Sequence, residues 1–164
     1  MKWYLILIIV LGSLGIGFYV FLRIVDLIFG GKPTNLGLQS GKLSPMKKTP
    51  KGVNSYTDYE PQKMAAFPYK GTKETAVKMM VNVLKNLKTS PRITFYEINL
   101  EKGYIWARDI SLFMRWKDDI EFYFDDDHMV QFRSSPRYGT YDWGFNRKRM
   151  ELIRDEFLKQ QSTY

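Results

Sequence analysis

Cysteine is absent from this chain of 164 residues, and histidine occurs only at position 128. The absence of cysteine excludes disulfide bonds, zinc–thiolate sites and a thiol nucleophile. A single histidine excludes most imidazole metal sites and most catalytic triads. Three adjacent Asp residues precede His128, but neighbouring side chains in a hairpin point apart, so we expect a turn there and not a calcium site. We therefore predict no metal ion and no cofactor.

Charged side chains are missing between Trp3 and Leu22. About 20 apolar residues in a helix cross the roughly 30 Å hydrocarbon core of a bilayer, so this segment is long enough to span it. A cleaved signal peptide is the alternative, but its apolar run is usually about 7–15 residues and ends at a small-x-small site. The segment from Ile24 to Phe29 offers no such site. We expect residues 1–29 to be an uncleaved, single-pass transmembrane anchor, with the lipid bilayer as partner.

The charges around this anchor leave its orientation open. Lys2 and the α-amine precede the span, whereas Arg23, Lys32 and Lys42 follow it. The excess of positive charge after the span mildly favours a cytoplasmic domain, but large domains can cross a membrane despite their charge.

The segment 30–66 is rich in proline and glycine and shows little periodicity. A connection of about this length is unusual for a free loop inside a domain. We expect a tether that continues into an extended arm lying on the folded domain, with Phe67 and Tyr69 at its docked end. The soluble domain is predicted to span residues 67–164.

The periodicity of this soluble part predicts an α+β domain. Thr72 can cap a helix whose apolar residues recur at helical spacing as far as Leu87, and a last helix starts near Phe145. Between them lie four strand-like segments whose connections are too short for parallel crossovers. After the N-terminal transmembrane helix we therefore expect the order α-β-β-β-β-α, with an antiparallel four-stranded meander and two helices on one face. The predicted strands span residues 92–100, 104–114, 117–124 and 129–135.

The segment RSSPRYGTYDWGFNRKR, from Arg133 to Arg149, combines four Arg and one Lys with four aromatic residues. It runs from the last predicted strand into the start of the last helix, where backbone N–H groups and the helix dipole favour anions. Its basic side chains could converge on a phosphate, a carboxylate or a lipid headgroup. The candidate ligand-binding residues are Arg133, Ser134, Arg137, Asp142, Asn146 and Arg147.

A closed ion-pair network is the alternative for the same segment. In such a network the arginines bond to Asp142, Asp118 or Asp119 and hold the loop in place. Neighbouring residues in a strand face opposite ways, so at most one of Asp118 and Asp119 can point to a given site. Arg115 is a further candidate for these supporting ion pairs. The sequence leaves both alternatives open.

Basic residues beside aromatic rings, in a chain of net charge +8, are also typical of proteins that bind single-stranded nucleic acid. The predicted anchor argues against that partner, and no RNA-recognition or helix-turn-helix motif is present. We therefore do not expect nucleic acid to be a partner.

Three motifs follow one another between Phe67 and Phe157. The first, Pro-Tyr-x-Gly, stands before a helix, and the second, Asp-Asp-x-Glu-Phe, lies in a strand. The third is the long Arg-rich segment. This order resembles an uncharacterised bacterial and plant family, domain of unknown function 1499. The matching positions are Pro68, Tyr69, Gly71, Asp118, Asp119, Glu121, Phe122, Arg133, Ser134, Arg137, Gly139, Asp142, Gly144, Asn146, Arg147 and Arg149.

The chain also departs from this family pattern. Pro136 stands where the family has its second Ser, so a serine nucleophile is impossible at that position. The linker of the family often carries a Cys pair, whose positions correspond here to Met46 and Gly52. Disulfides in relatives would indicate an oxidising compartment, and on this basis we expect an extracytoplasmic domain at the cell inner membrane. The resemblance implies no established reaction, ligand or partner.

These features together favour a non-enzymatic binding or accessory module of the bacterial inner membrane. Its partner would be an anionic small molecule, a lipid headgroup or a membrane protein. One alternative is a hydrolase or transferase that uses Asp119 or Asp142 as a base, and another is a scaffold whose Arg-rich segment is purely structural.

Overall fold

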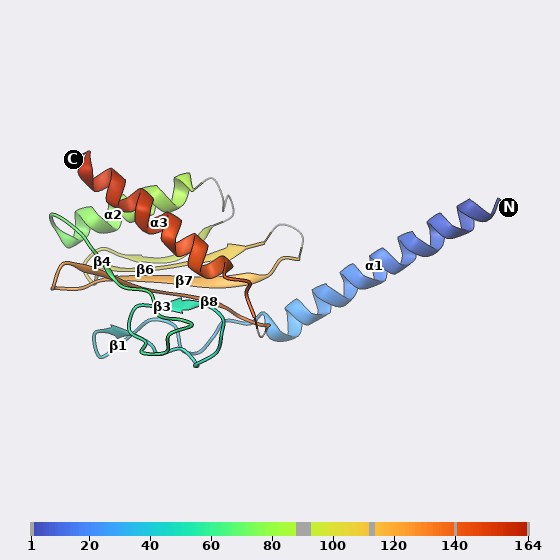
Figure 1. The fold of residues 1–164 in the computed structure, drawn as a ribbon, viewed down its shortest axis with the longest axis horizontal. Coiled ribbons are helices and arrows are strands. Elements are labelled where there is room, and N and C mark those ends of the chain that lie inside the picture. Colours follow the sequence, from blue (N-terminus) through green and yellow to red (C-terminus); the bar gives the residue numbers. More distant parts are fainter. Residues whose placement is uncertain (1, 88–92, 112–113, 140, 164) are drawn as a thin grey trace.

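The computed structural model describes residues 2–87, 93–111, 114–139 and 141–163. A long helix, α1 (Trp3–Phe29), extends away from a domain built on an antiparallel sheet (Figure 1). This helix of 27 residues is apolar and long enough to cross a membrane, although a signal sequence passes the same test. The predicted N-terminal helix and the α+β class of the domain are therefore confirmed.

The strands of the sheet follow the order β3-β8-β7-β6-β5, and β4 also pairs with β8. All of these pairings are antiparallel, and β5 to β8 form the predicted meander. Residue 92 of the first predicted strand and residues 112–113 of the second lie outside the described residues. The sheet strands are β3 (Val53–Asn54), β4 (Phe67–Pro68), β5 (Thr94–Asn99), β6 (Tyr104–Ile110), β7 (Lys117–Phe124) and β8 (Met129–Pro136).

Two helices, α2 (Lys73–Asn86) and α3 (Phe145–Ser162), cover one face of the sheet, as predicted (Figure 1). Thr72 caps α2, because its side-chain oxygen accepts a hydrogen bond from the Thr75 backbone N–H at 3.2 Å. Alternation along the strands then directs every second side chain toward these helices. The fully buried residues between this face and the helices are Ile105, Ile120, Phe122, Phe124, Val130, Phe132, Val77, Met80, Met150, Ile153 and Phe157.

The arm covers the opposite face of the sheet (Figure 1). It contains a small hairpin of β1 (Leu38–Gln39) and β2 (Lys42–Leu43) and then supplies β3 and β4 to the sheet itself. Leu43 packs with Tyr104 and Trp106 in a second, smaller apolar cluster. Because both faces are covered, polar side chains of the meander that alternation alone would send to solvent are buried beneath the arm.

Candidate functional site

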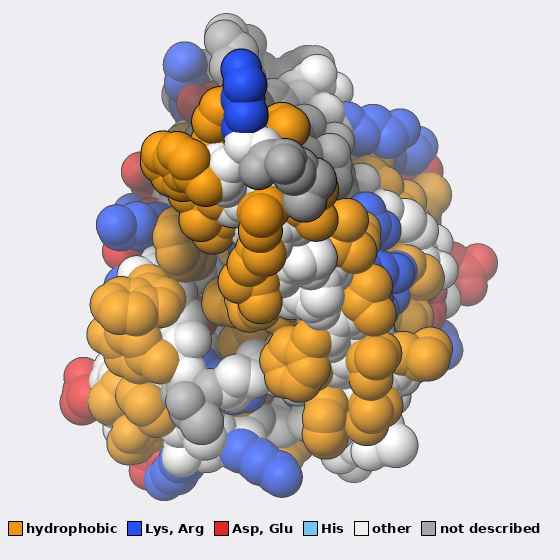
Figure 2. Space-filling model, turned by 90° about the vertical axis from the view of Figure 1, so that its right-hand side faces the viewer, with side chains coloured by type: hydrophobic (Ala, Val, Ile, Leu, Met, Phe, Trp, Pro, Cys, Tyr) orange, Lys and Arg blue, Asp and Glu red, His pale blue; other side chains and the backbone are white. Residues whose placement is uncertain are grey.

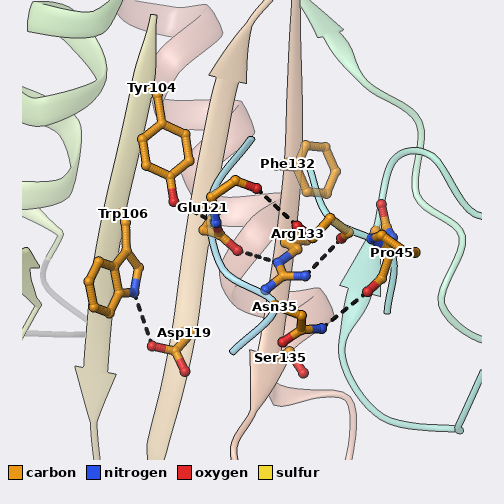
Figure 3. A network of polar contacts seen from close by, with 12 residues as sticks. Asn35, Pro45, Tyr104, Trp106, Asp119, Glu121, Phe132, Arg133 and Ser135 are labelled. Carbon is orange, nitrogen blue, oxygen red and sulfur yellow. Dashed lines mark hydrogen bonds and ion pairs between the residues drawn. The ribbon is translucent and has the colours of Figure 1, made fainter. Parts of the chain in front are cut away.

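Arg133, from β8, lies at the centre of a buried polar network beneath the arm (Figure 3). Its Nε atom donates to the Glu121 carboxylate, and its Nη1 atom donates to the Ser44 carbonyl at 2.7 Å. Glu121 also accepts from the Tyr104 hydroxyl at 2.5 Å and from the Gly37 backbone N–H at 2.6 Å. Burial and the nearby carboxylate raise the pKa of Tyr104. This network joins the arm to three neighbouring strands, β6, β7 and β8.

Arg137 binds Asp119 through a two-pronged contact on the same face of the sheet. The Nε and Nη2 atoms of Arg137 lie 2.8 and 2.9 Å from the two carboxylate oxygens, and both side chains are about 3% exposed. The Trp106 indole donates to the same carboxylate at 3.0 Å. The remaining Arg137 nitrogen, Nη1, donates to the Gly30 carbonyl at 2.7 Å, directly after α1. Each of the three guanidinium nitrogens thus donates a hydrogen bond within the protein.

The end of α1 is bonded to the domain a second time through Asp26. This carboxylate is buried and accepts from the Lys117 ammonium at 2.8 Å and from Arg23 at 3.2 Å. The Tyr138 hydroxyl lies 3.5 Å from the same carboxylate. Burial, together with the Asp26 charge, raises the pKa of Tyr138 to about 12. The last turn of the apolar helix is therefore fixed to the start of β7 and to the Arg-rich segment.

A third network lies on the helix-facing side of the sheet. Arg149 donates to Asp118 at 2.6 Å and lies 3.0 Å from Asp109, so one guanidinium serves two carboxylates. Asn146 accepts from the Ser134 hydroxyl and from Arg149. Burial raises the pKa of Asp118, although Arg149 opposes this effect.

Asp142 organises the loop before α3. Its carboxylate accepts from the backbone N–H groups of Gly52 and Gly144, at 3.0 and 3.1 Å, and from the Asn146 amide at 2.9 Å. Burial alone would raise the pKa of Asp142, but these donors outweigh it and hold the pKa below its usual range. Asp142 thus ties the arm to the start of α3.

The candidate arginines do not share one site in the structure. Arg133 and Arg137 each have a carboxylate beneath the arm, whereas Arg147 donates to the Lys63 carbonyl at 2.8 Å. Arg115 contributes its carbonyl as an acceptor for Tyr138, and among the described residues no carboxylate pairs with its side chain. The candidates that do come together are Ser134, Asn146 and, through Asn146, Asp142.

Two cavities adjoin these networks. The smaller, of about 270 Å³, lies at the start of α3 beside Asp142 and Arg147. The larger, of about 1170 Å³, lies between the last turns of α1 and the end of the domain that carries Asp118, Asn146 and Arg149. Figure 2 views the molecule from the side on which α1 extends, and hydrophobic side chains gather over much of that face. No group of acidic or histidine side chains suited to a metal ion occurs within the described ranges.

Several residues of these networks were missed by the sequence-based predictions. Asp26 could have been recognised in the sequence, because a carboxylate near the end of an apolar helix needs a partner, and this need predicts a contact with the domain. Alternation places Glu121 on the face of β7 opposite to Phe122, and it is buried there because the arm, which has no periodicity of its own, covers that face. Asp109 and Lys117 gave no distinctive signal in the sequence.

The fold and its networks define a class of protein: an α+β domain wrapped by its own N-terminal arm and bonded to the end of an apolar helix. The family model of "Protein of unknown function (DUF1499)" matches residues 42–157, and the chain belongs to this family. The matched region begins within the arm, in agreement with the two strands that the arm adds to the sheet. Neither the curated proteins nor the solved structures contain a significant match.

The positions that correspond to the Cys pair of the family lie close together in space. A Cβ atom added to Gly52 would stand 2.8 Å from the Met46 Cε atom. The methionine side chain therefore occupies the space beside Gly52 in this chain.

Proposed function

We propose that this protein is a single-pass, non-enzymatic binding module of the bacterial inner membrane, with an extracytoplasmic domain held against the bilayer surface. Its partner is membrane lipid, with headgroups contacted by the end of the domain next to α1. The observation that carries this proposal is the double attachment of α1 to the domain, through Asp26 to Lys117 and through Gly30 to Arg137.

This attachment favours an anchor that stays on the mature protein. Removal of α1 as a signal peptide would take away the acceptor of Lys117, whose side chain is 19% exposed. It would also affect the Gly30 carbonyl, which accepts a hydrogen bond from the buried Arg137. Cleavage would either remove this carbonyl or leave it at a free chain end. A buried cation without its partner is costly, so a helix meant for cleavage would be poorly suited to these contacts.

Aromatic side chains at the same end of the domain support contact with lipid. Trp143 is 71% exposed and Phe145 is 63% exposed, and both lie at the start of α3. Trp116 and Tyr141 are also exposed and line the large cavity beside α1. Aromatic rings are enriched at the bilayer–water interface, and each basic residue near an anionic surface adds about 1 kcal/mol of attraction.

A hydrolase or transferase is less well supported, because the two proposed bases have other roles. Asp119 is held by Arg137 and by the Trp106 indole, and Asp142 accepts hydrogen bonds from three donors. A scaffold role fits Arg133 and Arg137, which we assign to stability of the fold and of the helix junction.

Intact-mass measurement on the protein from membranes tests the anchor. We expect the mass of the full chain, with residues 1–29 present, and resistance to extraction by alkaline carbonate. The absence of cysteine in the natural chain allows orientation to be measured with one added thiol, for example at the exposed Lys70. A Lys70→Cys protein should react with a membrane-impermeant reagent from the extracytoplasmic side. A mature chain that lacks α1 would overturn the proposal.

Contact with the bilayer surface is tested by tryptophan fluorescence in vesicles that contain lipids brominated near the headgroup. We expect quenching to fall when Trp143 is replaced by Phe, because this side chain is exposed at the end of the domain next to α1. Trp106, which is buried beneath the arm, provides an internal reference that these lipids do not reach. Equal quenching of the natural and Trp143→Phe proteins would contradict the proposed contact.

A further inference from the structure

We propose that the large cavity between α1 and the domain binds one membrane lipid. Its polar head, which carries an N–H or O–H donor, lies at Asp118, and its acyl chain follows α1 toward the bilayer. This inference rests on the proposed membrane anchoring and adds a site and a ligand class to it.

The cavity has the size and the apolar walls that an acyl chain requires. Its volume of about 1170 Å³ exceeds the roughly 300–1,000 Å³ of most small-molecule sites. One wall is a stripe of α1 that runs from Phe21 to Phe29, eight residue steps and therefore about 12 Å of helix. The facing wall comes from the end of the domain. Its apolar residues include Ile110, Met114, Trp116, Phe145 and Leu152.

The cavity lies beside the end of α1 from which the predicted membrane span begins. α1 lines the cavity with its last turns and then extends away from the domain (Figure 1). Its apolar residues continue toward the N-terminus along the part of the helix that would lie in the bilayer. A lipid from the adjoining leaflet can place its chains along this stripe without leaving the hydrocarbon. Its head then meets the domain at the interface, the depth at which lipid headgroups lie.

Where the domain closes the cavity, the lining is polar, and its side chains are held by hydrogen bonds to one another. Asp118, Asn146 and Arg149 line it, and Asn146 is fully buried. Both hydrogen bonds to Asp118, from Arg149 at 2.6 Å and from Asn146 at 3.5 Å, reach the same oxygen, Oδ2. Within the described part of the chain, the other oxygen, Oδ1, accepts no hydrogen bond. It is the acceptor that a ligand donor would meet.

This acceptor decides the class of lipid. A primary ammonium or a hydroxyl can donate to the Asp118 carboxylate, whereas a quaternary ammonium has no N–H to donate. Burial raises the pKa of Asp118, because it disfavours the charged carboxylate. A further hydrogen-bond donor from a ligand would stabilise that charge. Lys148, also part of the lining and exposed to solvent, can meet the phosphate of the same lipid.

Native mass spectrometry of the full chain, released from nanodiscs of defined composition, tests the site. The lipids are phosphatidylethanolamine, with an ammonium donor, phosphatidylglycerol, with hydroxyl donors, and phosphatidylcholine, with neither. We expect one retained lipid per chain and about tenfold less retention of phosphatidylcholine, the size expected for a hydrogen bond to a charged group. The two donor lipids identify whether ammonium or hydroxyl is preferred. Equal retention of all three would overturn the donor contact at Asp118.

Matched substitutions separate the cavity from the surface of α1. Val25→Trp fills the cavity and should reduce retention of every lipid about tenfold. Ile24→Trp, on the neighbouring exposed position of α1 and outside the cavity lining, should leave retention unchanged. Asp118→Asn keeps the volume and should lower retention of the donor lipids to the level of phosphatidylcholine. Thermal unfolding of each variant checks that the domain is folded.

The outcomes distinguish this inference from the proposed function. A full-length, membrane-anchored chain that retains no lipid, or a Val25→Trp protein that retains lipid as well as the natural chain, would overturn the cavity site and leave the anchor in place. A mature chain without α1 would overturn both, because one wall of the cavity would be lost.

Discussion

Asp118 and Asp119 are neighbours in β7, yet their carboxylates bond to different arginines on opposite faces of the sheet. Asp118 accepts from Arg149 at 2.6 Å on the side of the helices, and Asp119 accepts from Arg137 at 2.8 Å beneath the arm. The Arg-rich segment therefore binds carboxylates on both faces of one strand, because it leaves the end of β8 and turns into α3 on the helix-covered face. This relationship explains why its arginines lie in separate networks.

Replacing Arg137 by Ala should destabilise the domain by about 3–5 kcal/mol, because Asp119 would be left buried without its cation. Chemical denaturation of the full chain in detergent measures the change. Lys78→Ala is the matched control, since its ion pair with Glu74 is exposed and should contribute at most about 0.5 kcal/mol. A loss for Arg137→Ala no larger than the control would contradict the buried ion pair.

The pair of Arg133 and Glu121 should show strong coupling in a double-mutant cycle. Each single replacement, Arg133→Met or Glu121→Leu, leaves one buried charge alone and should cost about 3–5 kcal/mol. The double replacement removes both charges and should be less harmful than the sum of the two by 2 kcal/mol or so. Free energies of unfolding that add without coupling would show that the two side chains do not act as a pair.

Gly52 should not tolerate a side chain. Its φ is +75°, and an added Cβ would stand 2.5 Å from the Ser134 carbonyl oxygen, which belongs to the backbone of β8 and cannot move freely. We expect Gly52→Ala to lower the free energy of unfolding by about 1–3 kcal/mol. Gly31→Ala, where a Cβ meets nothing within 4 Å, provides the control and should change stability little.

Asp142 should make stability depend on pH in the acid range. Its pKa in the folded domain lies below the ordinary 3.8, so the unfolded chain binds a proton first as pH falls. The stabilising contribution is then complete above about pH 5 and is lost as pH falls from 3.8 through the lower folded value. Asp142→Asn should therefore destabilise the domain at pH 7 by about 1–2 kcal/mol, and by progressively less toward pH 3.

The contribution of Asp142 is read from unfolding curves of both proteins between pH 3 and pH 7. The Gly52 and Gly144 backbone N–H groups and the Asn146 amide are retained in the variant, so the comparison reports the lost carboxylate charge. A difference that stays constant over this range would show that Asp142 is not held ionised by these donors.

The helix-facing half of the fold was predictable from local pattern. Alternation along the predicted strand 117–124 places Ile120, Phe122 and Phe124 on one face, and all three are fully buried against the helices. Thr72 was recognisable as a cap because a hydroxyl before a helix accepts an early backbone N–H. Such signals depend on residues close together in the sequence, so they need no knowledge of the tertiary fold.

The arm-facing half was not predictable in the same way. Arg133 donates a hydrogen bond to the Ser44 carbonyl, which lies 89 residues earlier in the chain. Arg137 donates one to the Gly30 carbonyl, 107 residues earlier. Backbone carbonyls of an irregular segment carry no side-chain signature. Their role as acceptors follows only from the path of the arm across the sheet.

The sequence by itself determined the apolar N-terminal helix, the order of the meander and its two helices, and the position of the Arg-rich segment, because periodicity and motif spacing are local properties. The tertiary structure decided which carboxylate each arginine meets, since the arm buries one face of the sheet and α3 the other. It also decided that Asp26 joins α1 to the domain and that a cavity lies beside this junction. The junction joins Asp26 to Lys117, 91 residues later in the chain, and only the folded chain brings such distant segments into contact.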